Sequence, residues 1–311
     1  MRAIGDKTVT IGRGGRAWRR ARYTATFAGG AIVGALGIAA YTARELNEPR
    51  QQGWRDTYTF TPWEVQIPHA VVGFATDDGL TLRGWWFPQP GTDRVIVGAT
   101  GHKGAKTDLL GIGSGLWRAG NNVLLFDYRG CGESDPAPLS VGFHEQGDLR
   151  AAIRFARERV PQARLGLIGY SMGAALAILI AATDPAIRAV IADSAYATLA
   201  GVVGAAYGRY RLPSRPFLAL SDHYNGWRYG YRYDALRPSD AIGALAPRPL
   251  LIIHGARDGV TPVAHAHELY AVAGEPKELW IAEGAHHCGA YFLDRRTYVS
   301  RAAAFFDNAL T

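Results

Sequence analysis

A serine that could act as a nucleophile lies in the stretch 165–177, which reads L-G-L-I-G-Y-S-M-G-A-A-L-A. An apolar run leads into Gly169 to Gly173 and small residues follow, so we expect a strand, a sharp turn and a helix. The pattern is G-x-S-x-G, whose glycines let the chain turn tightly and leave the hydroxyl of Ser171 exposed. A serine hydroxyl is a weak nucleophile at neutral pH, so it needs an adjacent base and a carboxylate that orients the base.

A candidate carboxylate and a candidate base occur later in the chain, each after a run of residues typical of a strand. Asp258 lies in H-G-A-R-D-G, directly after L-L-I-I, and His287 lies in E-G-A-H-H-C, after L-W-I-A. The carboxyl ends of parallel strands share one edge of a sheet, where ligands bind. The chain order Ser171, Asp258, His287 therefore predicts a Ser-His-Asp triad for acyl transfer.

Several neighbouring residues compete for these two roles. Asp193 ends another expected strand, so it is the alternative carboxylate, and His286 is the alternative base. Asp258 could instead cap the helix that follows it, because Asp is a good N-cap. Since Pro262 would begin that helix, we expect Thr261 to be the cap and Asp258 to remain available.

No pattern in the sequence indicates a metal or an organic cofactor, and we expect neither. The two cysteines, Cys131 and Cys288, can form at most one disulfide, and no C-x-x-C spacing occurs. Cys288 lacks a turn like the one around Ser171, so we interpret it as a packing residue. His144 and Glu145 precede an expected helix without an H-E-x-x-H pattern, which favours a structural role.

The elements that must position these residues begin near residue 70 with two expected strands, 71–75 and 82–87, joined by the turn signal Asp77-Asp78-Gly79. Further strands are expected over 94–98, 122–126, 165–168, 189–192, 249–254 and 277–282, and helices over 106–119, 147–159, 172–183, 262–273 and 297–309. An antiparallel start followed by alternating strands and helices predicts an α/β fold, with a mostly parallel central sheet and helices on both faces.

A long insertion follows the strand that ends at Asp193, and we expect residues 196–243 to form a cap over the active site. Aromatic residues with polar tips suit the wall of a pocket for an amphiphilic acyl substrate. They suit equally well a pair of inserted helices whose tyrosines pack on the core. The aromatic residues concerned are Tyr196, Tyr207, Tyr210, Phe217, Tyr224, Trp227, Tyr229, Tyr231 and Tyr233.

The N-terminal segment has the features of a membrane anchor. Basic residues crowd a tail over 1–22, and residues 23–43 contain no charge. Twenty-one residues in a helix span about 31 Å, close to the thickness of a bilayer core. We favour an uncleaved signal anchor with a cytoplasmic N-terminus and a periplasmic or extracellular catalytic domain. A cleaved signal peptide and a buried or peripheral helix are the alternatives.

Two smaller signals lie in the same segment. Arg19-Arg20 suggests a twin-arginine export signal, but the residues that follow fit that pattern poorly. Gly30 and Gly34 form G-x-x-x-G, which would allow a homodimer through the membrane helix, although this spacing arises easily in a run rich in glycine and alanine. Residues 44–69 then read as a linker to a folded domain over 70–311.

The charge of the chain excludes one class of function. The formal net charge is +7 in 311 residues, and part of it comes from the basic tail. No basic stripe with interleaved aromatic residues follows, so we expect no binding of nucleic acid. With 48% hydrophobic and 20% charged residues, the chain is an ordinary globular one that can bury a large core.

From about residue 70 to residue 311 the chain resembles the α/β-hydrolase superfamily, most closely the bacterial serine esterase, lipase and aminopeptidase-like branch. The matching stretches are D-Y-R-G-C-G-E-S at 127–134, G-Y-S-M-G at 169–173, I-A-D-S at 191–194, G-A-R-D at 255–258 and G-A-H-H at 284–287. The resemblance implies the α/β-hydrolase fold and favours His287 over His286 as the base.

The resemblance also implies an oxyanion hole, and here the sequence departs from the family. The family usually carries His-Gly-x-x-Gly after the third strand, where this chain has T-G-H-K-G at 100–104. By the resemblance, the backbone amides of His102 and Met172 would hold the oxyanion. Backbone donors do not depend on side-chain type, so the replacement of the leading histidine by Thr100 is compatible with such a hole.

Together these features predict a membrane-anchored serine hydrolase that cleaves carboxylic esters, with lipid-like acyl esters among the small-molecule candidates. An aminopeptidase-like enzyme, a thioesterase and an acyltransferase remain open alternatives. A catalytically silent domain that only binds a partner is a further alternative, which the complete set of Ser171, Asp258 and His287 argues against.

Overall fold

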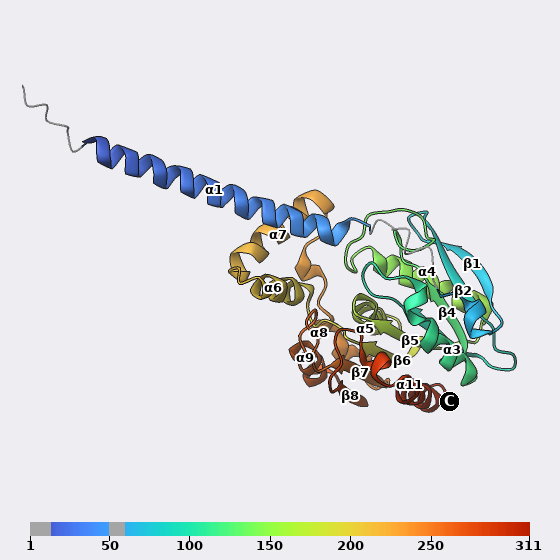
Figure 1. Cartoon of the computed structure of the whole chain (residues 1–311). Helices are drawn as coiled ribbons and strands as arrows, with labels where there is room; N and C mark the ends of the chain where they lie inside the picture. Colours follow the sequence, from blue (N-terminus) through green and yellow to red (C-terminus); the bar gives the residue numbers. More distant parts are fainter. Residues whose placement is uncertain (1–13, 50–59) are drawn as a thin grey trace, which may run out of the picture.

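The computed structural model describes residues 14–49 and 60–311, and its centre is a mostly parallel sheet of eight strands (Figure 1). The strands are β1 Ala70–Ala75, β2 Thr81–Phe87, β3 Arg94–Ala99, β4 Asn122–Phe126, β5 Arg164–Tyr170, β6 Ile187–Asp193, β7 Leu250–Gly255 and β8 Lys277–Ala282. Their order across the sheet is β1-β2-β4-β3-β5-β6-β7-β8. β2 is antiparallel to both of its neighbours, and all later pairs are parallel.

Helices cover both faces of this sheet, which confirms the predicted fold. On one face lie α4 Glu145–Arg159, α5 Met172–Thr183 and α9 Ala264–Val272. On the other lie the 3-10 turn η2 Lys106–Leu109, α3 Leu110–Arg118, α10 Ala290–Leu293 and α11 Arg295–Ala309. The central strands β4 and β7 are buried along their whole length because both of their faces are covered.

The expected cap consists of two longer helices, α6 Leu199–Arg209 and α7 Ser214–Tyr229, followed by the short turns η3 Tyr233–Ala235, α8 Pro238–Ala241 and η4 Ile242–Leu245. The cap has a hydrophobic cluster of its own. Four of the tyrosines considered for a pocket wall are buried in it, as the packing alternative predicts, although Tyr231 also lines a pocket: Tyr196, Tyr207, Tyr231 and Tyr233. Tyr210 and Trp227 are instead exposed.

The N-terminal apolar segment is part of a single long helix, α1 Gly14–Asn47, which projects from the domain (Figure 1). Over Arg22–Asn47 the helix is long and apolar enough to cross a membrane. Its last turns pack against α7 of the cap, and the helix continues into the first residues of the expected linker. The short helix α2 Pro62–Val65 also lies in that linker, whereas residues 1–13 and 50–59 lie outside the described part.

Candidate active site

Ser171 occupies a strained turn between β5 and α5. Its φ of 51° and ψ of −114° are sparsely populated by residues other than glycine, and its amide donates to the carbonyl of Asp193 at 2.8 Å. A Cβ on Gly169 would lie 2.4 Å from the backbone of Gly173, and a Cβ on Gly173 would lie 2.2 Å from the carbonyl oxygen of Ala99. The two glycines of the motif therefore allow the close backbone contacts that hold the serine at the tip of the turn.

The structure brings the three predicted side chains together in one chain of hydrogen bonds. Nε2 of His287 lies 2.9 Å from the hydroxyl of Ser171, and Nδ1 of His287 lies 2.7 Å from Oδ2 of Asp258. His287 is 22% exposed, whereas the side chain of Asp258 is fully buried. The distances suit proton transfer from the hydroxyl to the imidazole and orientation of the imidazole by the carboxylate.

The carboxylate of Asp258 is held from its other side by the backbone. Its Oδ1 accepts from the amides of Val260 and Thr261, both at 2.8 Å. Burial of the carboxyl opposes its ionisation, but the hydrogen bond from His287, the charge of that imidazole and the two amides outweigh it, so the pKa of Asp258 lies below its usual value. Asp258 is therefore a buried anion that faces the imidazole.

These contacts distinguish His287 from His286, and they test the expected role of Thr261. His286 is exposed and its Nδ1 lies 3.1 Å from the carbonyl of Arg257, away from the serine. The expectation that Thr261 caps the next helix is wrong: α9 begins at Ala264, Val263 precedes it, and no side chain caps it. The amide of Thr261 donates to the carboxylate of Asp258, and the helix begins three residues later.

The alternative acid, Asp193, is buried near these three residues in a different hydrogen-bond network. Its Oδ1 accepts from the hydroxyl of Ser194 at 2.9 Å and its Oδ2 from the hydroxyl of Tyr298 at 3.0 Å. Burial raises the pKa of Asp193 to about 7, against these hydrogen bonds, which lower it. The hydroxyl of Ser194 also accepts from the amide of Cys288 at 3.0 Å, so this network supports the loop that carries His287.

Sequence reasoning missed Ser194 and Tyr298 as supports of the site. Ser194 directly follows a strand end, and its φ of 58° marks an unusual turn that the sequence does not reveal. Tyr298 lies in the last helix, and nothing in its local sequence indicates that its hydroxyl reaches Asp193. Burial raises the pKa of the Cys288 thiol well above its usual value, which agrees with a packing role.

The expected oxyanion loop lies directly beside Ser171. A Cβ on Gly101 would lie 3.4 Å from the Cβ of Ser171, and the amide of Gly104 donates to the carbonyl of Gly101 at 3.1 Å to form a turn. In the part of the chain that the structure describes, the backbone amides of His102 and Met172 donate none of the turn, loop or side-chain hydrogen bonds. Burial lowers the pKa of His102 to about 3, with a smaller effect of Lys103, so its ring is neutral.

A buried ionic cluster holds the far end of this loop. The carboxylate of Asp127 accepts from the amide of Lys106 at 2.7 Å, from its ammonium at 2.5 Å and from the amide of Glu133 at 3.0 Å. A Cβ on Gly132 would lie 2.2 Å from the carboxyl of Asp127. Asp127, Gly132 and Glu133, in the stretch 127–134 that carries the resemblance, therefore position the expected oxyanion loop.

The described residues contain no group of three or more His, Cys, Asp or Glu side chains that could hold a metal.

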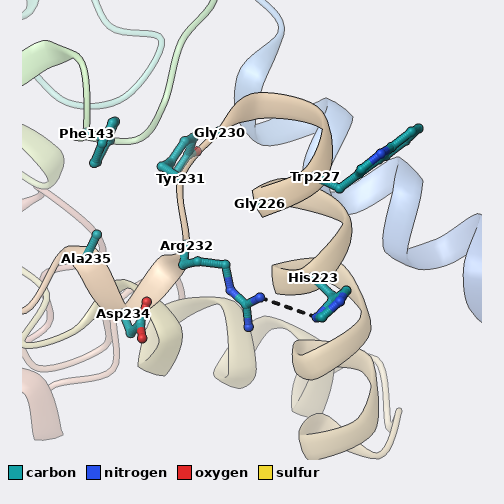
Figure 2. Close-up of a pocket in the computed structure, with 9 residues that line it drawn as sticks. All are labelled: Phe143, His223, Gly226, Trp227, Gly230, Tyr231, Arg232, Asp234 and Ala235. Atoms are coloured by element: carbon teal, nitrogen blue, oxygen red, sulfur yellow. Dashed lines mark hydrogen bonds between the residues drawn. The ribbon is translucent and has the colours of Figure 1, made fainter.

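A pocket of about 550 Å³ opens on the cap, beside the C-terminal half of α7 (Figure 2). It is lined by Phe143, His223, Gly226, Trp227, Gly230, Tyr231, Arg232, Asp234 and Ala235. Ser171, Asp258 and His287 are not among these residues, so this pocket is separate from them.

Comparison with known proteins adds three findings. The family described as the alpha/beta hydrolase fold matches residues 98–210. The uncharacterized protein YfhR of Escherichia coli O157:H7 is 34% identical over 249 residues, covering 77% of this chain and 79% of its own. The polyketide transferase ATR5 of Stachybotrys chlorohalonatus is 27% identical over 266 residues, covering 70% and 89%.

Solved structures are similar as well. An esterase of Pyrococcus furiosus, Pf2001, superposes with a TM-score of 0.70 at 26% identity. The match covers 86% of this chain and 98% of the esterase.

Proposed function

Because the chain belongs to the α/β-hydrolase fold family, we propose that it is a membrane-anchored serine hydrolase that cleaves carboxylic esters. The observation that carries this proposal is the continuous hydrogen-bond chain from the hydroxyl of Ser171 through His287 to the buried Asp258. The similarity to an esterase of Pyrococcus furiosus supports ester cleavage over other acyl chemistry.

In the proposed reaction, the hydroxyl of Ser171 attacks the acyl carbonyl while Nε2 of His287 accepts its proton. The proton then passes from His287 to the leaving alcohol, and an acyl-enzyme remains on Ser171. Asp258 keeps the other ring nitrogen protonated and stabilises the imidazolium. Water, deprotonated by His287, attacks the acyl-enzyme and releases the carboxylic acid.

The negative charge that develops on the carbonyl oxygen would be held by the amides of His102 and Met172. Met172 is the first residue of α5, so its amide also lies at the positive end of a helix dipole. Loss of one such donor typically costs about 10²–10³-fold in rate. The neutral ring of His102 adds no charge that would compete with these amides.

A fluorophosphonate probe tests the nucleophile. Wild-type protein should be labelled, Ser171→Ala should not, and the exposed Ser300→Ala should be labelled like wild type. Absence of label in well-folded wild-type protein would contradict an active enzyme and favour a silent binding domain. A series of p-nitrophenyl esters of increasing chain length, set against aminoacyl anilides and thioesters, then distinguishes an esterase from an aminopeptidase-like enzyme or a thioesterase.

Acyl transfer to an acceptor other than water is the second candidate, and the similarity to a polyketide transferase favours it. The two candidates share the acyl-enzyme and differ in what attacks it. Adding small alcohols to the ester assay separates them, because a transferase forms the new ester at the expense of the free acid. If the yield of free acid does not change across the alcohol series, acyl transfer is contradicted and hydrolysis is the remaining candidate.

We propose that α1 anchors the enzyme, with the catalytic domain on the periplasmic or extracellular side. The apolar span and the basic residues that precede it support this orientation. Protease added to intact cells, with the outer membrane permeabilised where there is one, should digest the catalytic domain. Protection of the domain until the membrane is dissolved would contradict the orientation.

A further inference from the structure

The contact between α1 and the cap limits where the folded domain can lie relative to the membrane. One side of α1 is at least half-buried from Ala35 onward, and the fully covered residues Ala39, Ala43 and Asn47 recur every four positions. On α7 the buried residues Ser221 and Asn225 show the same spacing. These small residues let the two helices approach closely, as the packing of α1 on α7 shows.

Buried hydrogen bonds make this contact specific. Nδ2 of Asn47 donates to Oδ1 of Asn225 at 2.7 Å, and Nδ2 of Asn225 donates to the carbonyl of Tyr231 at 2.7 Å. The carbonyl of Asn47 accepts from the amide of Leu139 at 2.8 Å. The end of α1 is therefore joined to the folded domain rather than connected to it by a free tether.

The length of the span places the cap at the membrane. The uncharged run is bounded by Arg22 and Arg44, so it cannot slide in either direction without burying a charge. The part that is free of the cap, Tyr23 to Gly34, spans only about 18 Å in a helix, against about 30 Å for a bilayer core. The remaining span is the part against which α7 packs, so a helix that crosses the bilayer brings α7 to the outer leaflet.

The exposed face of α7 has the composition of a membrane-surface helix. Pro216, Leu220, His223 and Trp227 are exposed and follow one another at helical spacing. Trp227 is 78% exposed and projects away from Phe143 and Tyr231 (Figure 2). Tryptophan is enriched where a membrane meets water, because its ring is apolar and its N–H is polar.

The charge of the cap complements anionic lipid headgroups. Between residues 196 and 243 the sequence has six arginines and three acidic residues, and Asp222 pairs with Arg232 and Asp240 with Arg237. The other four arginines are exposed: Arg209, Arg211, Arg215 and Arg228. Basic side chains near an anionic surface each favour binding.

The anchor also reaches the candidate active site. Oε1 of Glu45 lies 2.8 Å from Nζ of Lys103, the residue that follows His102 in the loop beside Ser171. Glu45 directly follows Arg44, which is the first charged residue after the apolar span. The loop that would hold the oxyanion is therefore one side-chain contact away from the end of the membrane segment.

We propose that the exposed face of α7 rests on the anionic surface of the bilayer that α1 enters, and that the enzyme takes an acyl ester residing in that bilayer. This inference rests on the proposed anchor and names the substrate class for the proposed serine hydrolase. The pocket beside α7 shares His223 and Trp227 with the exposed face, so it opens next to the same surface.

Depth-dependent quenching tests the geometry on the full chain in vesicles of phosphatidylcholine and phosphatidylglycerol. Single cysteines that replace Val33 in α1, Ala219 on the exposed face of α7 and Asn308 in α11 would carry a nitrobenzoxadiazole label. The native thiols of Cys131 and Cys288 have a raised pKa because they are buried, so they react slowly. Spin-labelled lipids should quench position 33 deeply and position 219 at headgroup depth, and should leave position 308 unquenched.

The three positions separate failure of the inference from failure of the anchor. Quenching at 33 without quenching at 219 would overturn the placement of the cap and leave the anchor intact. No quenching at 33 would contradict the anchor itself, and the inference would fall with it.

The substrate class is tested by the ratio of activity on a long-chain ester in the same vesicles to activity on a soluble short-chain ester. In Arg215→Glu/Arg228→Glu this ratio should fall by about fivefold or more for each arginine that contacts the surface. The matched control, Arg295→Glu/Arg296→Glu, alters exposed arginines of α11 and should leave the ratio unchanged. An unchanged ratio in the α7 variant would overturn the proposed source of the substrate.

Discussion

The carboxyl-end edge of the sheet and the cap are organised in opposite ways. At the edge, Ser171, Asp258 and His287 each lie within a few residues of a strand end, and short local sequences place them. In the cap, the positions of the tyrosines depend on how α6, α7 and α1 pack together. Residues governed by local turns can be found from sequence patterns, whereas residues governed by packing between distant segments cannot.

The two buried carboxylates at the edge and the tyrosine Tyr207 in the cap differ in their hydrogen bonds. Both oxygens of Asp258 and of Asp193 have hydrogen-bond partners at the edge of the sheet. In the cap, the hydroxyl of Tyr207 is buried and has no hydrogen-bond partner among the described residues. The edge also holds buried polar atoms without a partner among the described residues, such as Oγ1 of Thr100 and Nδ1 of His254, so the contrast applies to the two carboxylates and not to the whole region.

The largest expected effect compares the two carboxylates at the edge. Asp258→Asn should lower kcat by about 10⁴-fold, because the amide no longer favours the imidazole tautomer that accepts the proton of Ser171. Asp193→Asn should cost far less, because Asp193 contacts Ser194 and Tyr298 rather than His287. Steady-state kinetics on one p-nitrophenyl ester measures both. Equal losses in the two variants would make Asp193 a member of the catalytic set.

The next effect compares a glycine of the edge with a glycine of the cap. A Cβ on Gly173 would lie 2.2 Å from a backbone oxygen, so Gly173→Ala should lose several kcal/mol or fail to fold. A Cβ on Gly204 in α6 would meet only the side chain of Leu218, at 3.8 Å. Gly204→Ala should therefore gain up to about 1 kcal/mol from helix propensity. Urea denaturation measures both, and a Gly173→Ala variant as stable as wild type would contradict the packing of the turn.

These comparisons show where prediction from the sequence ends. The alternation of strands and helices was enough to predict the sheet. The positions of the strand ends were enough to predict that Ser171, Asp258 and His287 lie at one edge. Local patterns left His286 and Asp193 open as alternatives to His287 and Asp258, because each choice depends on which side chain points along the edge. They could not show that Tyr298, more than 100 residues away in sequence, reaches Asp193.

The packing of the cap and of α1 was harder to predict. Their expected ranges follow from composition, but the docking of α1 on α7 depends on Ala39, Ala43 and Asn47, residues that look ordinary in a small-residue helix. Thr261 illustrates the same limit on a smaller scale. Its type and its place before Pro262 are typical of a cap, yet the helix begins only at Ala264, and the amide of Thr261 donates to Asp258.

A smaller effect should appear in the pH dependence of stability. The pKa of Asp193 is raised by burial to about 7, so the folded protein binds this proton more tightly than the unfolded chain does. Its contribution to stability is complete below about pH 4 and is lost as the pH rises through about 7. In wild type this loss lowers Tm between pH 5 and pH 8.

Asp193→Asn removes that titration and should reduce the change in Tm over the same range by several degrees. Thermal unfolding at the two pH values measures it. Asp135→Asn is the control, because it alters a carboxylate elsewhere, which bonds the amide of Thr81. An identical pH dependence in wild type and Asp193→Asn would mean that Asp193 is ionised in the folded protein across the range.

The smallest effect is expected at Tyr207, and it tests the cap side of the comparison. The ring is 4% exposed and lies against Phe217 with the ring centres 5.7 Å apart. Because the hydroxyl is buried without a partner among the described residues, its removal in Tyr207→Phe leaves no group unsatisfied. The free energy of unfolding should therefore stay within about 0.5 kcal/mol of wild type, or rise slightly.

Ester hydrolysis by Tyr207→Phe should also match wild type, in kcat and in KM, because a packed tyrosine contributes its ring and not its hydroxyl. Tyr207→Ala provides the contrast, since it removes the ring and should cost about 3–5 kcal/mol of stability. If the Phe variant instead raises KM while its stability is unchanged, the hydroxyl contacts the substrate. Tyr207 would then belong to a pocket wall, and the cap would be a site of specificity as well as a packed cover.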